Sequence, residues 1–437
     1  MIHVQCCRRS AELHTLAIGL AAMVLANAAL AFVVPPLPEI PNGVFNITNY
    51  GAIGDGVTTN TAAIQAAVDA ASAAGGGTVE VPAGVFLSGP FRIDSAINLR
   101  VDGLLRMLPL SKYPGGTADP PDFISGSGLH DIVISGSGMI DGQGIPWWPY
   151  ARVRGARRPR MISLASCDRV LIENLTLTNS PMFHIAIHGR SANVTVRGVT
   201  ICANPSTDPV NPGHNTDACD VSGTNILVEN CDVSVGDDDF TCGGGTSDVL
   251  ITNCTYGYGH GVSIGSATSG GVSNLTVVNC TFNNTEQGIR IKSDRDRGGF
   301  LHNLRYLNLR MTNVDLPILI YATYNATNRE YRALNNLSAV IAATYPSNAV
   351  VRRTPIYRDI TFSNITATAA PDRRAGLIWG LPEMAVSNVL LQDVTIRADY
   401  PFGIYDARGV RLVDTQIITP AGTNQLSCTN AEVTITP

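Results

Sequence analysis

Three segments of this 437-residue chain can be written under one another: LVENCDVSVGDDD, LITNCTYGYGHG and VVNCTFNNTEQG. They place Cys231, Cys254 and Cys280 in the same position, 23 and then 26 residues apart. Weaker copies occur upstream, in LIENLTLTNSP and VTVRGVTICANP, and downstream, in YLNLRMTNVD and DITFSNITATAA. Short β-type runs that recur roughly every 20–30 residues indicate stacked coils rather than separate domains.

The composition of these runs favours one architecture, a right-handed parallel β-helix. The runs are rich in Val, Ile, Thr and Leu and are punctuated by Gly and Asn, as expected for short strands joined by tight turns. We therefore expect an all-β, single-domain solenoid. The three cysteines then form an inward-facing ladder of small apolar side chains, and such a ladder does not require disulfides.

The segment TNTAAIQAAVDAASAAGGG predicts a helix ahead of the first coils. It has Ile64, Ala67, Val68 and Ala71 at helical spacing, threonine or asparagine at its start and glycines at its end. An amphipathic helix there would cover the open apolar end of the solenoid, because terminal coils need a cap.

The N-terminus has the pattern of a secretory signal. Arg8 and Arg9 precede the apolar run LAIGLAAMVLANAALA, which ends in the small-residue triplet Ala29-Leu30-Ala31. A membrane anchor is the alternative, but the run is short for a span. We expect residues 1–31 to be removed and residues 32–437 to form the β-helix domain. The protein would then be secreted, outside the cell or, in a bacterium, into the periplasm.

The net charge limits the classes of partner, and the glycosylation motifs have a structural interpretation. The net charge of −5 and the absence of a basic block argue against nucleic acid and anionic membranes. Ten Asn-x-Ser/Thr motifs occur, and many stand where a repeat places asparagine at a turn, so turn or ladder asparagine is the preferred interpretation. They include Asn174, Asn193, Asn253, Asn274, Asn279, Asn283, Asn325 and Asn364.

Extending the alignment by one strand brings charged residues into register. The segments TDACDVSG, DDFTCGGG, HGVSIGS and QGIRIKS align, so that one position is shared by Asp217, Asp238, His260 and Gln287. Asp237 comes one place earlier. Because neighbouring strands lie about 4.8 Å apart, side chains that are distant in sequence would meet on one face.

Two cations follow on the next strand. Arg290 and Lys292 are two residues apart, so their side chains point the same way and lie beside the acids. Taken singly, each motif has an ordinary explanation. The aspartates from Asp237 to Asp239 could be a solvated loop or a calcium site, His260 a turn residue, and Arg-x-Lys an exposed strand. Their convergence in one register favours a functional site.

Four motifs in order now carry a family resemblance: NTD at 215–217, GDD at 236–238, GHG at 259–261 and RIK at 290–292, followed by Tyr324 in LIYATY. Further support comes from YGAIGDGVTTNTAAIQAAVDAA, DGQGIPWW and RPRMI. Over roughly residues 45–415 the chain resembles the family 28 glycoside hydrolases, the polygalacturonases and their relatives. These are right-handed parallel β-helices that act on pectin.

The resemblance implies an inverting hydrolysis with one role for each matched residue. Asp237 would be the general acid, Asp217 and Asp238 would orient and deprotonate water, and His260 would tune the acid's proton or bind a sugar hydroxyl. Arg290 and Lys292 would bind the substrate carboxylate, and Tyr324 would close that subsite. Three neighbouring carboxylates cannot all ionise at low cost, so one should keep its proton.

Three further features of the sequence bear on the site. Asp239 stands where relatives often have cysteine, and Ala218 where glycine is common, so we do not expect the usual local disulfide, and we assign Asp239 no catalytic role. Trp147 and Trp148 are candidate sugar platforms, although paired aromatics are as often core. The insertion ANPSTDPVNPGH at 203–214 could wall off one end of a groove and favour chain-end attack, or simply be a loop.

We expect a pectic polysaccharide as the partner, with no cofactor, metal, nucleic acid or membrane, and a monomeric mature protein. The backbone could be homogalacturonan, xylogalacturonan or rhamnogalacturonan. A pectate lyase, with calcium on the aspartates and arginine as the base, is the nearest rival enzyme. A non-catalytic polysaccharide-binding β-helix of the tailspike kind is a further alternative.

Overall fold

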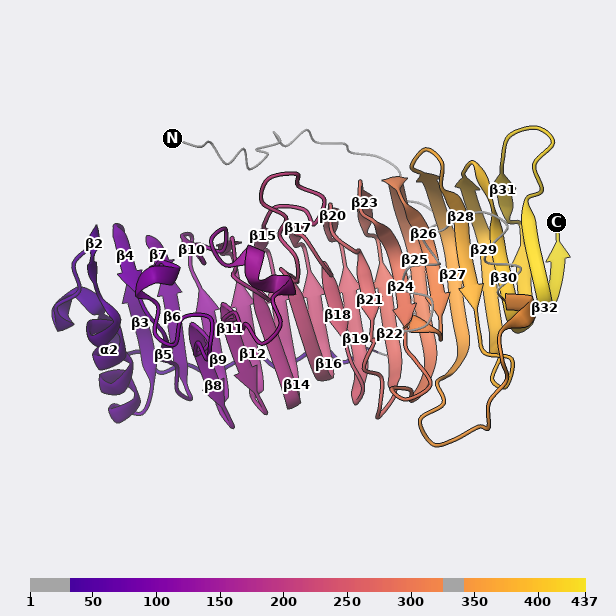
Figure 1. Ribbon diagram of the computed structural model, residues 1–437. Coiled ribbons are helices and arrows are strands. Elements are labelled where there is room, and N and C mark those ends of the chain that lie inside the picture. Colours follow the sequence, from indigo (N-terminus) through magenta and orange to yellow (C-terminus); the bar gives the residue numbers. More distant parts are fainter. Residues whose placement is uncertain (1–31, 325–341) are drawn as a thin grey trace, which may run out of the picture. The chain divides into compact units, whose positions relative to one another are not determined.

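The computed structural model describes residues 32–324 and 342–437. The elements below belong to the unit formed by residues 35–437. Its chain winds through successive coils, and every strand pairing between coils is parallel (Figure 1). The pairings follow three ladders, one for each side of the coil. The parallel β-helix predicted from the repeats is confirmed.

The first ladder carries the candidate site and is called the groove ladder here. Its strands are β5 (Phe91–Arg92), β8 (Ile124–Ser127), β11 (Ile162–Ala165), β14 (Ile185–Arg197), β16 (Cys219–Glu229), β18 (Phe240–Cys242), β21 (Val262–Ile264), β24 (Gln287–Lys292), β26 (Leu316–Tyr321), β28 (Arg374–Trp379), β30 (Tyr400–Val413) and β32 (Leu426–Thr436).

The second ladder begins at the end that α2 covers and is later joined by the long strands β14, β16, β30 and β32. Its other strands are β1 (Val44–Asn46), β3 (Gly77–Val81), β6 (Ile97–Val101), β9 (His130–Ser135), β12 (Asp168–Glu173), β19 (Thr246–Thr252), β22 (Val272–Val278), β25 (Phe300–Val314), β27 (Ile356–Ala369) and β29 (Val386–Arg397).

The third ladder closes each coil, and β25, β27 and β29 are long enough to continue into it. Its shorter strands are β2 (Asp55–Thr59), β4 (Val85–Ser88), β7 (Leu104–Met107), β10 (Met139–Asp141), β13 (Thr176–Thr178), β15 (Thr200–Cys202), β17 (Asp232–Ser234), β20 (Thr255–Gly257), β23 (Thr281–Asn283) and β31 (Gln416–Ile418). The described residues also contain three 3-10 turns: η1 (Ile47–Tyr50), η2 (Leu110–Lys112) and η3 (Trp148–Arg152).

The core is made of rows of equivalent side chains stacked from coil to coil. One buried row in the second ladder runs through Val228, Ile251, Val277, Tyr306, Phe362, Leu391 and Leu412. Within it the rings of Tyr306 and Phe362 stack with centroids 4.9 Å apart. Stacking of like on like is what a repeat of short alternating strands dictates, because each coil must bury its inner face against its neighbours.

The three aligned cysteines behave as predicted. Cys231, Cys254 and Cys280 are buried and carry unpaired thiols. Their stacking adds small apolar volume to the core without covalent links. The predicted thiol ladder is therefore confirmed.

The asparagine turns are also confirmed at most of the predicted positions. A left-handed backbone occurs at Asn174, Asn193, Asn253, Asn274, Asn279 and Asn364. Amides stack between coils, as where Asn364 donates to Asn308 (2.8 Å) and Asn308 donates to Asn279 (3.1 Å). Asn283 instead lies in β23 with an ordinary strand backbone. Asn325 lies outside the described residues.

Helix α2 (Thr61–Ala73) covers one end of the solenoid (Figure 1). The four residues that the spacing predicted to face the core are all buried. The start of the helix differs from the expectation, because the side chain of Asn60 does not cap it. That side chain instead accepts a 2.7 Å hydrogen bond from the backbone N–H of Ile53, and Thr61 Oγ1 accepts one of 2.6 Å from Gly89 N–H. These side chains tie the cap to neighbouring turns.

The predicted leader at residues 1–31 lies outside the described residues and stays a prediction. Within the described part of the chain, no helix combines the length and apolarity that crossing a membrane requires.

Candidate active site

The register of the groove ladder agrees with the alignment made from the sequence. Cys219 pairs with Phe240, Phe240 with Val262, and Val262 with Ile289. Two residues before these positions stand Asp217, Asp238, His260 and Gln287, the four residues that the alignment placed in one slot. Backbone hydrogen bonds continue the pairing toward them, since Ala218 N–H donates to the carbonyl of Asp238 (2.9 Å). Stacking therefore brings the four motifs together.

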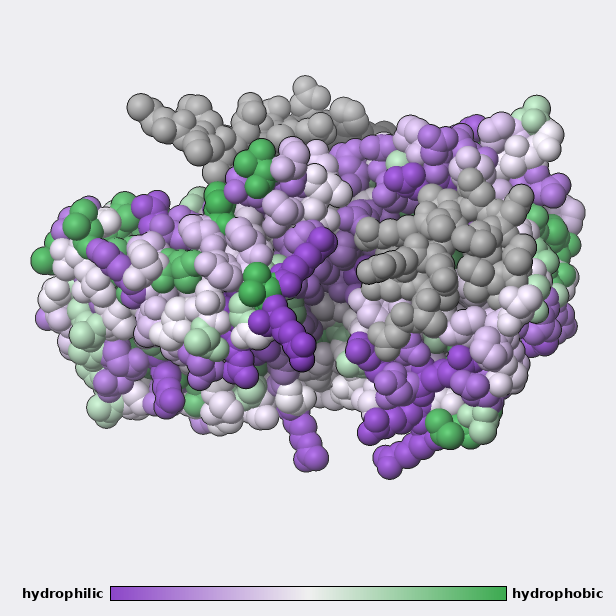
Figure 2. Space-filling view, in the orientation of Figure 1, coloured by the Kyte–Doolittle hydropathy of each residue, from purple (hydrophilic) through white to green (hydrophobic). Residues whose placement is uncertain are grey.

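The motifs line a groove of about 860 Å³. All seven predicted site residues contribute to its lining: Asp217, Asp237, Asp238, His260, Arg290, Lys292 and Tyr324. Hydrophilic side chains border the hollowed middle of the face seen in Figure 2. The aspartates and the histidine come from turns that precede groove-ladder strands, whereas Arg290 and Lys292 lie within β24. A polar groove over a rigid ladder suits recognition of a polar chain.

Asp238 is the best-compensated carboxylate of the cluster. Lys292 Nζ lies 3.0 Å from its Oδ2, Arg290 Nη2 contacts its Oδ1, and the hydroxyl of Ser263 donates to Oδ1 at 2.7 Å. Burial acts to raise the pKa of Asp238, but the charges of Arg290 and Lys292 outweigh it and hold the pKa below the ordinary value. Asp238 is therefore ionised at neutral pH.

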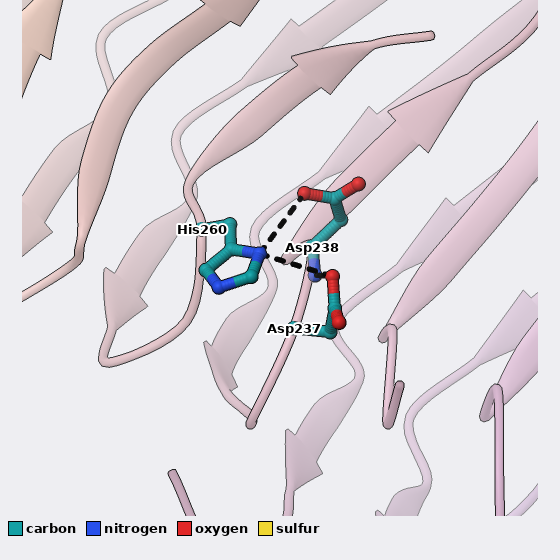
Figure 3. Close-up of side chains that lie close together, drawn as sticks. All are labelled: Asp237, Asp238 and His260. Carbon is teal, nitrogen blue, oxygen red and sulfur yellow. Dashed lines mark hydrogen bonds and ion pairs between the residues drawn. The ribbon is translucent and has the colours of Figure 1, made fainter. Parts of the chain in front are cut away.

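Asp237 is paired with His260 (Figure 3). Nδ1 of His260 lies 3.0 Å from Asp237 Oδ1 and 3.7 Å from Asp238 Oδ1. Burial raises the pKa of Asp237, but His260, followed by Lys292 and Arg290, lowers it below the ordinary value. For His260 burial lowers the pKa, and Asp237 more than offsets this, so the imidazole pKa is raised. The pair shares a proton that favours the histidine.

A second contact at Nδ1 of His260, from Arg290, affects whether the shared proton lies on His260 or on Asp237. Nη2 of Arg290 lies 3.0 Å from His260 Nδ1, and a guanidinium can only donate. Nδ1 can therefore donate to Asp237 or accept from Arg290, but it cannot do both. On the other side of the ring, Nε2 lies 3.5 Å from Glu286 Oε1, which also accepts a 2.7 Å hydrogen bond from Ser206.

Asp217 has the opposite environment. Its side chain is buried, and Oδ1 has no hydrogen-bond partner among the described residues. Burial raises its pKa well above the ordinary value, and Asp237 and Asp238 raise it further. We expected one carboxyl of the cluster to keep its proton. In the protein's own charge distribution that carboxyl is Asp217, whereas the resemblance implies Asp237 as the proton donor.

Lys292 and Tyr324 are neighbours in the lining of the groove. The ammonium of Lys292 lies 5.6 Å from the ring centroid of Tyr324, within the range of a cation–π contact. Both side chains line the groove, as predicted. The phenol therefore stands beside the cation that the resemblance assigns to a substrate carboxylate.

Several lining residues were not singled out from the sequence. Asp220 lies on the groove-ladder row next to Thr241, and burial raises its pKa to about 7, with Asp238 adding to the rise. Glu286 and Ser206 contact each other across 80 positions of sequence. The only available signal for Asp220 was its place three residues after Asp217 in NTDACD, and for Glu286 its place just before QGIRIK.

The two tryptophans are core residues, so their candidate role as sugar platforms is wrong. Trp147 is 0% and Trp148 1% exposed. Trp147 packs edge-on against Tyr113, and Trp148 Nε1 donates to the carbonyl of Ser180 at 2.9 Å. The sequence could not reveal this, because the turn that buries them is set by tertiary packing.

Three ligand atoms could in principle approach one cation. Single donor atoms of Asp237, Asp238 and His260 lie within 4.8 Å of one another. Lys292 and Arg290 already neutralise Asp238, however, and a third positive charge at that carboxylate would be repelled. The charge arrangement therefore fits carboxylate chemistry better than a metal centre.

A parallel β-helix whose coils stack three carboxylates beside an arginine and a lysine agrees with the class of β-helical glycoside hydrolases that the four motifs resemble. The profile of Glycosyl hydrolases family 28 matches residues 72–400. The chain belongs to this family.

Similar proteins include polygalacturonases from several sources. The polygalacturonase of Juniperus ashei is 30% identical over 374 residues, covering 81% of this chain and 68% of the relative. An exopolygalacturonase of Zea mays is 30% identical over 376 residues, covering 82% and 84%. Among solved structures, the exopolygalacturonase of Thermotoga maritima has a TM-score of 0.71 at 24% identity, covering 95% and 96% of the two chains. The similarity to this solved structure agrees with the fold described above, a parallel β-helix.

Proposed function

We propose that this protein hydrolyses α-1,4-galacturonosyl linkages of pectin with inversion of configuration, as a polygalacturonase. The observation that carries the proposal is the convergence of Asp217, Asp237 and Asp238 with Arg290 and Lys292 in one groove. The acids supply what glycoside hydrolysis requires, and the cations suit a polyanionic chain. The names of the similar proteins, which include polygalacturonases and exopolygalacturonases, support the same substrate class.

Asp237 is the proposed general acid. It lines the groove, and its hydrogen-bonded contact with His260 provides a second proton site at 3.0 Å. When Nδ1 of His260 passes its proton to Asp237, it becomes able to accept from Arg290, which favours the protonated carboxyl. Asp237 then donates to the glycosidic oxygen as the bond to the anomeric carbon breaks. The negative charge of the approaching substrate carboxylates also raises the pKa of Asp237, which further favours its protonated form.

Asp238 and Asp217 are the proposed water-binding pair. Asp238 is ionised and can accept a proton from the attacking water, whereas Asp217 carries the raised pKa and can orient that water as a donor or acceptor. Water attacks the anomeric carbon from the face opposite the leaving oxygen, which inverts its configuration. The catalytic cycle is complete when Asp238 releases this proton to solvent and the Asp237–His260 pair takes up a proton from solvent.

Arg290, Lys292 and Tyr324 are proposed to bind the galacturonate carboxylate at the cleavage subsite. In this structure both cations pair with Asp238, so a substrate carboxylate would share them rather than find them unused. This sharing of Arg290 and Lys292 suits the reaction, because binding of the substrate carboxylate then acts directly on the charge of Asp238, the proposed base. The hydroxyl of Tyr324 would complete the subsite by hydrogen bonding.

A decorated pectin backbone, xylogalacturonan or rhamnogalacturonan, is the alternative substrate. The groove wall formed in part by Ser206 and Thr207 of the 203–214 loop is where side branches would be accepted or excluded. A lyase is less favoured, since an arginine base would have to act while ion-paired with Asp238. We further propose that residues 1–31 are a secretory leader, and that the mature protein acts as a monomer without metal or cofactor.

The test is release of reducing ends from polygalacturonate, xylogalacturonan and rhamnogalacturonan, with EDTA present throughout. We expect activity on polygalacturonate that EDTA leaves unchanged and no product that absorbs in the ultraviolet. An unsaturated product, or loss of activity in EDTA, would contradict the proposal. The size profile of the products assigns chain-end or internal attack.

The acid assignment has its own test. Asp237→Asn should lower kcat on polygalacturonate by about 100-fold or more, the range lost with a general acid. The loss should be much smaller on an aryl galacturonide whose leaving group needs no proton. Asp69→Asn, at an exposed position of α2, is the matched control. Equal losses on both substrates would exclude Asp237 as the donor.

A further inference from the structure

Asp239 is a buried acid that the proposed mechanism does not use. Its side chain is 1% exposed and does not line the groove. Oδ2 accepts a 2.8 Å hydrogen bond from the backbone N–H of Gly261, and Oδ1 has no hydrogen-bond partner among the described residues. The carboxyl group therefore lies behind the turn that carries His260, on the side away from substrate.

We propose that Asp239 is a positioning residue, whose carboxyl group holds the 259–261 turn and thereby fixes the imidazole of His260 between Asp237 and Glu286. This inference deepens the proposed function and rests on it, because His260 matters only if the Asp237–His260 pair handles the proton. Asp239 makes no contact with the groove and acts through the turn alone.

The turn is held at each of its three residues, and at Gly259 the carbonyl accepts a 2.7 Å hydrogen bond from Glu286 N–H. His260 N–H donates to the carbonyl of Asp237 (2.8 Å), and the N–H groups of Asp239 and Phe240 donate to the carbonyl of Gly261 (3.1 and 3.2 Å). The carboxyl of Asp239 supplies the remaining bond, to Gly261 N–H. Without it, a buried donor would lose its partner next to the imidazole, which is unfavourable.

Close packing adds to the hydrogen bond. Gly259 has φ +95°, and a Cβ added there would stand 2.5 Å from Oδ1 and 2.8 Å from Oδ2 of Asp239. The carboxyl is thus in contact with the backbone of both glycines that flank His260. The turn cannot shift toward the core while this side chain is in place, so the ring is set at its distance from Asp237.

The charge state fits a positioning role. Burial raises the pKa of Asp239 well above the ordinary value, and Asp238 and Asp237 raise it further. A neutral carboxyl keeps a carbonyl oxygen to accept from Gly261 without adding a further negative charge beside Asp237 and Asp238. An ionised Asp239 would instead compete for the cations that neutralise Asp238.

The test is a double-mutant cycle on kcat. Asp239→Asn keeps an oxygen acceptor for Gly261 N–H and should retain kcat within about twofold of wild type. Asp239→Leu has a similar size without an acceptor, and should lower kcat by about tenfold with little change in KM. In the His260→Ala background the same Asp239→Leu change should have no further effect, since the ring it positions is gone.

A purely structural role predicts the opposite pattern. If Asp239→Leu lowers kcat by the same factor with and without His260, or lowers only the melting temperature while kcat per folded molecule is unchanged, the positioning role is wrong. Asp239→Ala enters the same cycle should the leucine variant not fold. Equal losses in the Asn and Leu variants would also overturn it.

A substrate-free measurement separates this inference from the proposed function. The pKa of His260, followed by NMR with labelled histidine, should change in Asp239→Leu and stay near wild type in Asp239→Asn. Inactivity of the wild type on every pectic polymer would refute the proposed function alone. An unchanged His260 pKa in Asp239→Leu would refute the positioning role whatever the substrate.

Discussion

Four aspartates within one short region have four different environments, and the partners of each explain the difference. Asp238 has two cations, Asp237 has a histidine, Asp217 has neither, and Asp239 has a backbone N–H. Identical side chains therefore divide into bases, donors and neutral groups. Their roles follow from what surrounds each carboxyl, because the intrinsic pKa is common to all of them.

Removing Lys292 should shift the pH profile in a defined direction. Burial raises the pKa of Asp238, and Arg290 and Lys292 together hold it low. In Lys292→Gln one of these charges is lost, so the pKa of Asp238 rises and the base becomes protonated at a higher pH. The acidic limb of kcat against pH should then move to higher pH.

The chain offers a matched control for this experiment, since Lys112 is the only other lysine and is exposed on η2. Lys112→Gln should leave the profile unchanged. An acidic limb that stays in place in Lys292→Gln would show that Asp238 is not the group whose ionisation limits the rate at low pH.

The turn that carries the NTD motif at 215–217 is held by a buried arginine. Arg158 donates to the carbonyls of Pro181 (2.9 Å) and His214 (2.7 Å) and to Asn215 Oδ1 (3.0 Å). Asn215 in turn donates to Asp237 through its backbone N–H (3.3 Å) and its side chain (3.2 Å). The end of the 203–214 loop is therefore connected to the proposed acid by one side chain.

Arg158→Lys should lower kcat by about tenfold and affect KM less. A lysine ammonium cannot reproduce a planar fork that serves three acceptors, so the turn at Asn215 loosens. The neighbouring Arg157, which pairs with Asp119 on the surface with 70% and 82% of the side chains exposed, provides the control Arg157→Lys. Steady-state kinetics that leave Arg158→Lys indistinguishable from that control would contradict the link.

At the element level the sequence was most informative where the repeat was regular. The spacing of the cysteines and the four motifs gave the register, because β-helix coils pair in register and small errors would turn side chains to the other face. It could not give the burial of Trp147 and Trp148, the bond between Ser206 and Glu286, or the capping detail at Asn60. Those depend on loops of irregular length, whose path only the packed structure determines.

At the scale of the whole molecule, stacking of the coils buries several acidic side chains, and stability should depend on their protonation. Asp220 has a pKa of about 7 in the fold against an ordinary 3.8, chiefly because it is buried. The folded state thus binds a proton that the unfolded chain releases between these values. This contribution is full below the unfolded pKa and is lost as pH rises through about 7.

Asp220→Asn should therefore remove a fall in stability between about pH 4 and pH 7. The difference in pKa corresponds to about 4 kcal/mol, an upper figure for the change in the free energy of unfolding across that range. Denaturant unfolding at several pH values measures it, with Asp248→Asn at an exposed position of β19 as control. Parallel pH profiles of wild type and Asp220→Asn would contradict the buried, protonated state of Asp220.

Hydrolysis with inversion requires that the stacked coils bring acid and base to opposite sides of one sugar linkage. Proton NMR of the first product formed from polygalacturonate measures this most directly, because it reads the configuration of the new reducing end before it equilibrates. If hydrolysis inverts the anomeric configuration, the β-anomer should appear first from the α-linked polymer. Initial release of the α-anomer would mean that a covalent or other retaining route operates, and would contradict the roles given to Asp217, Asp237 and Asp238.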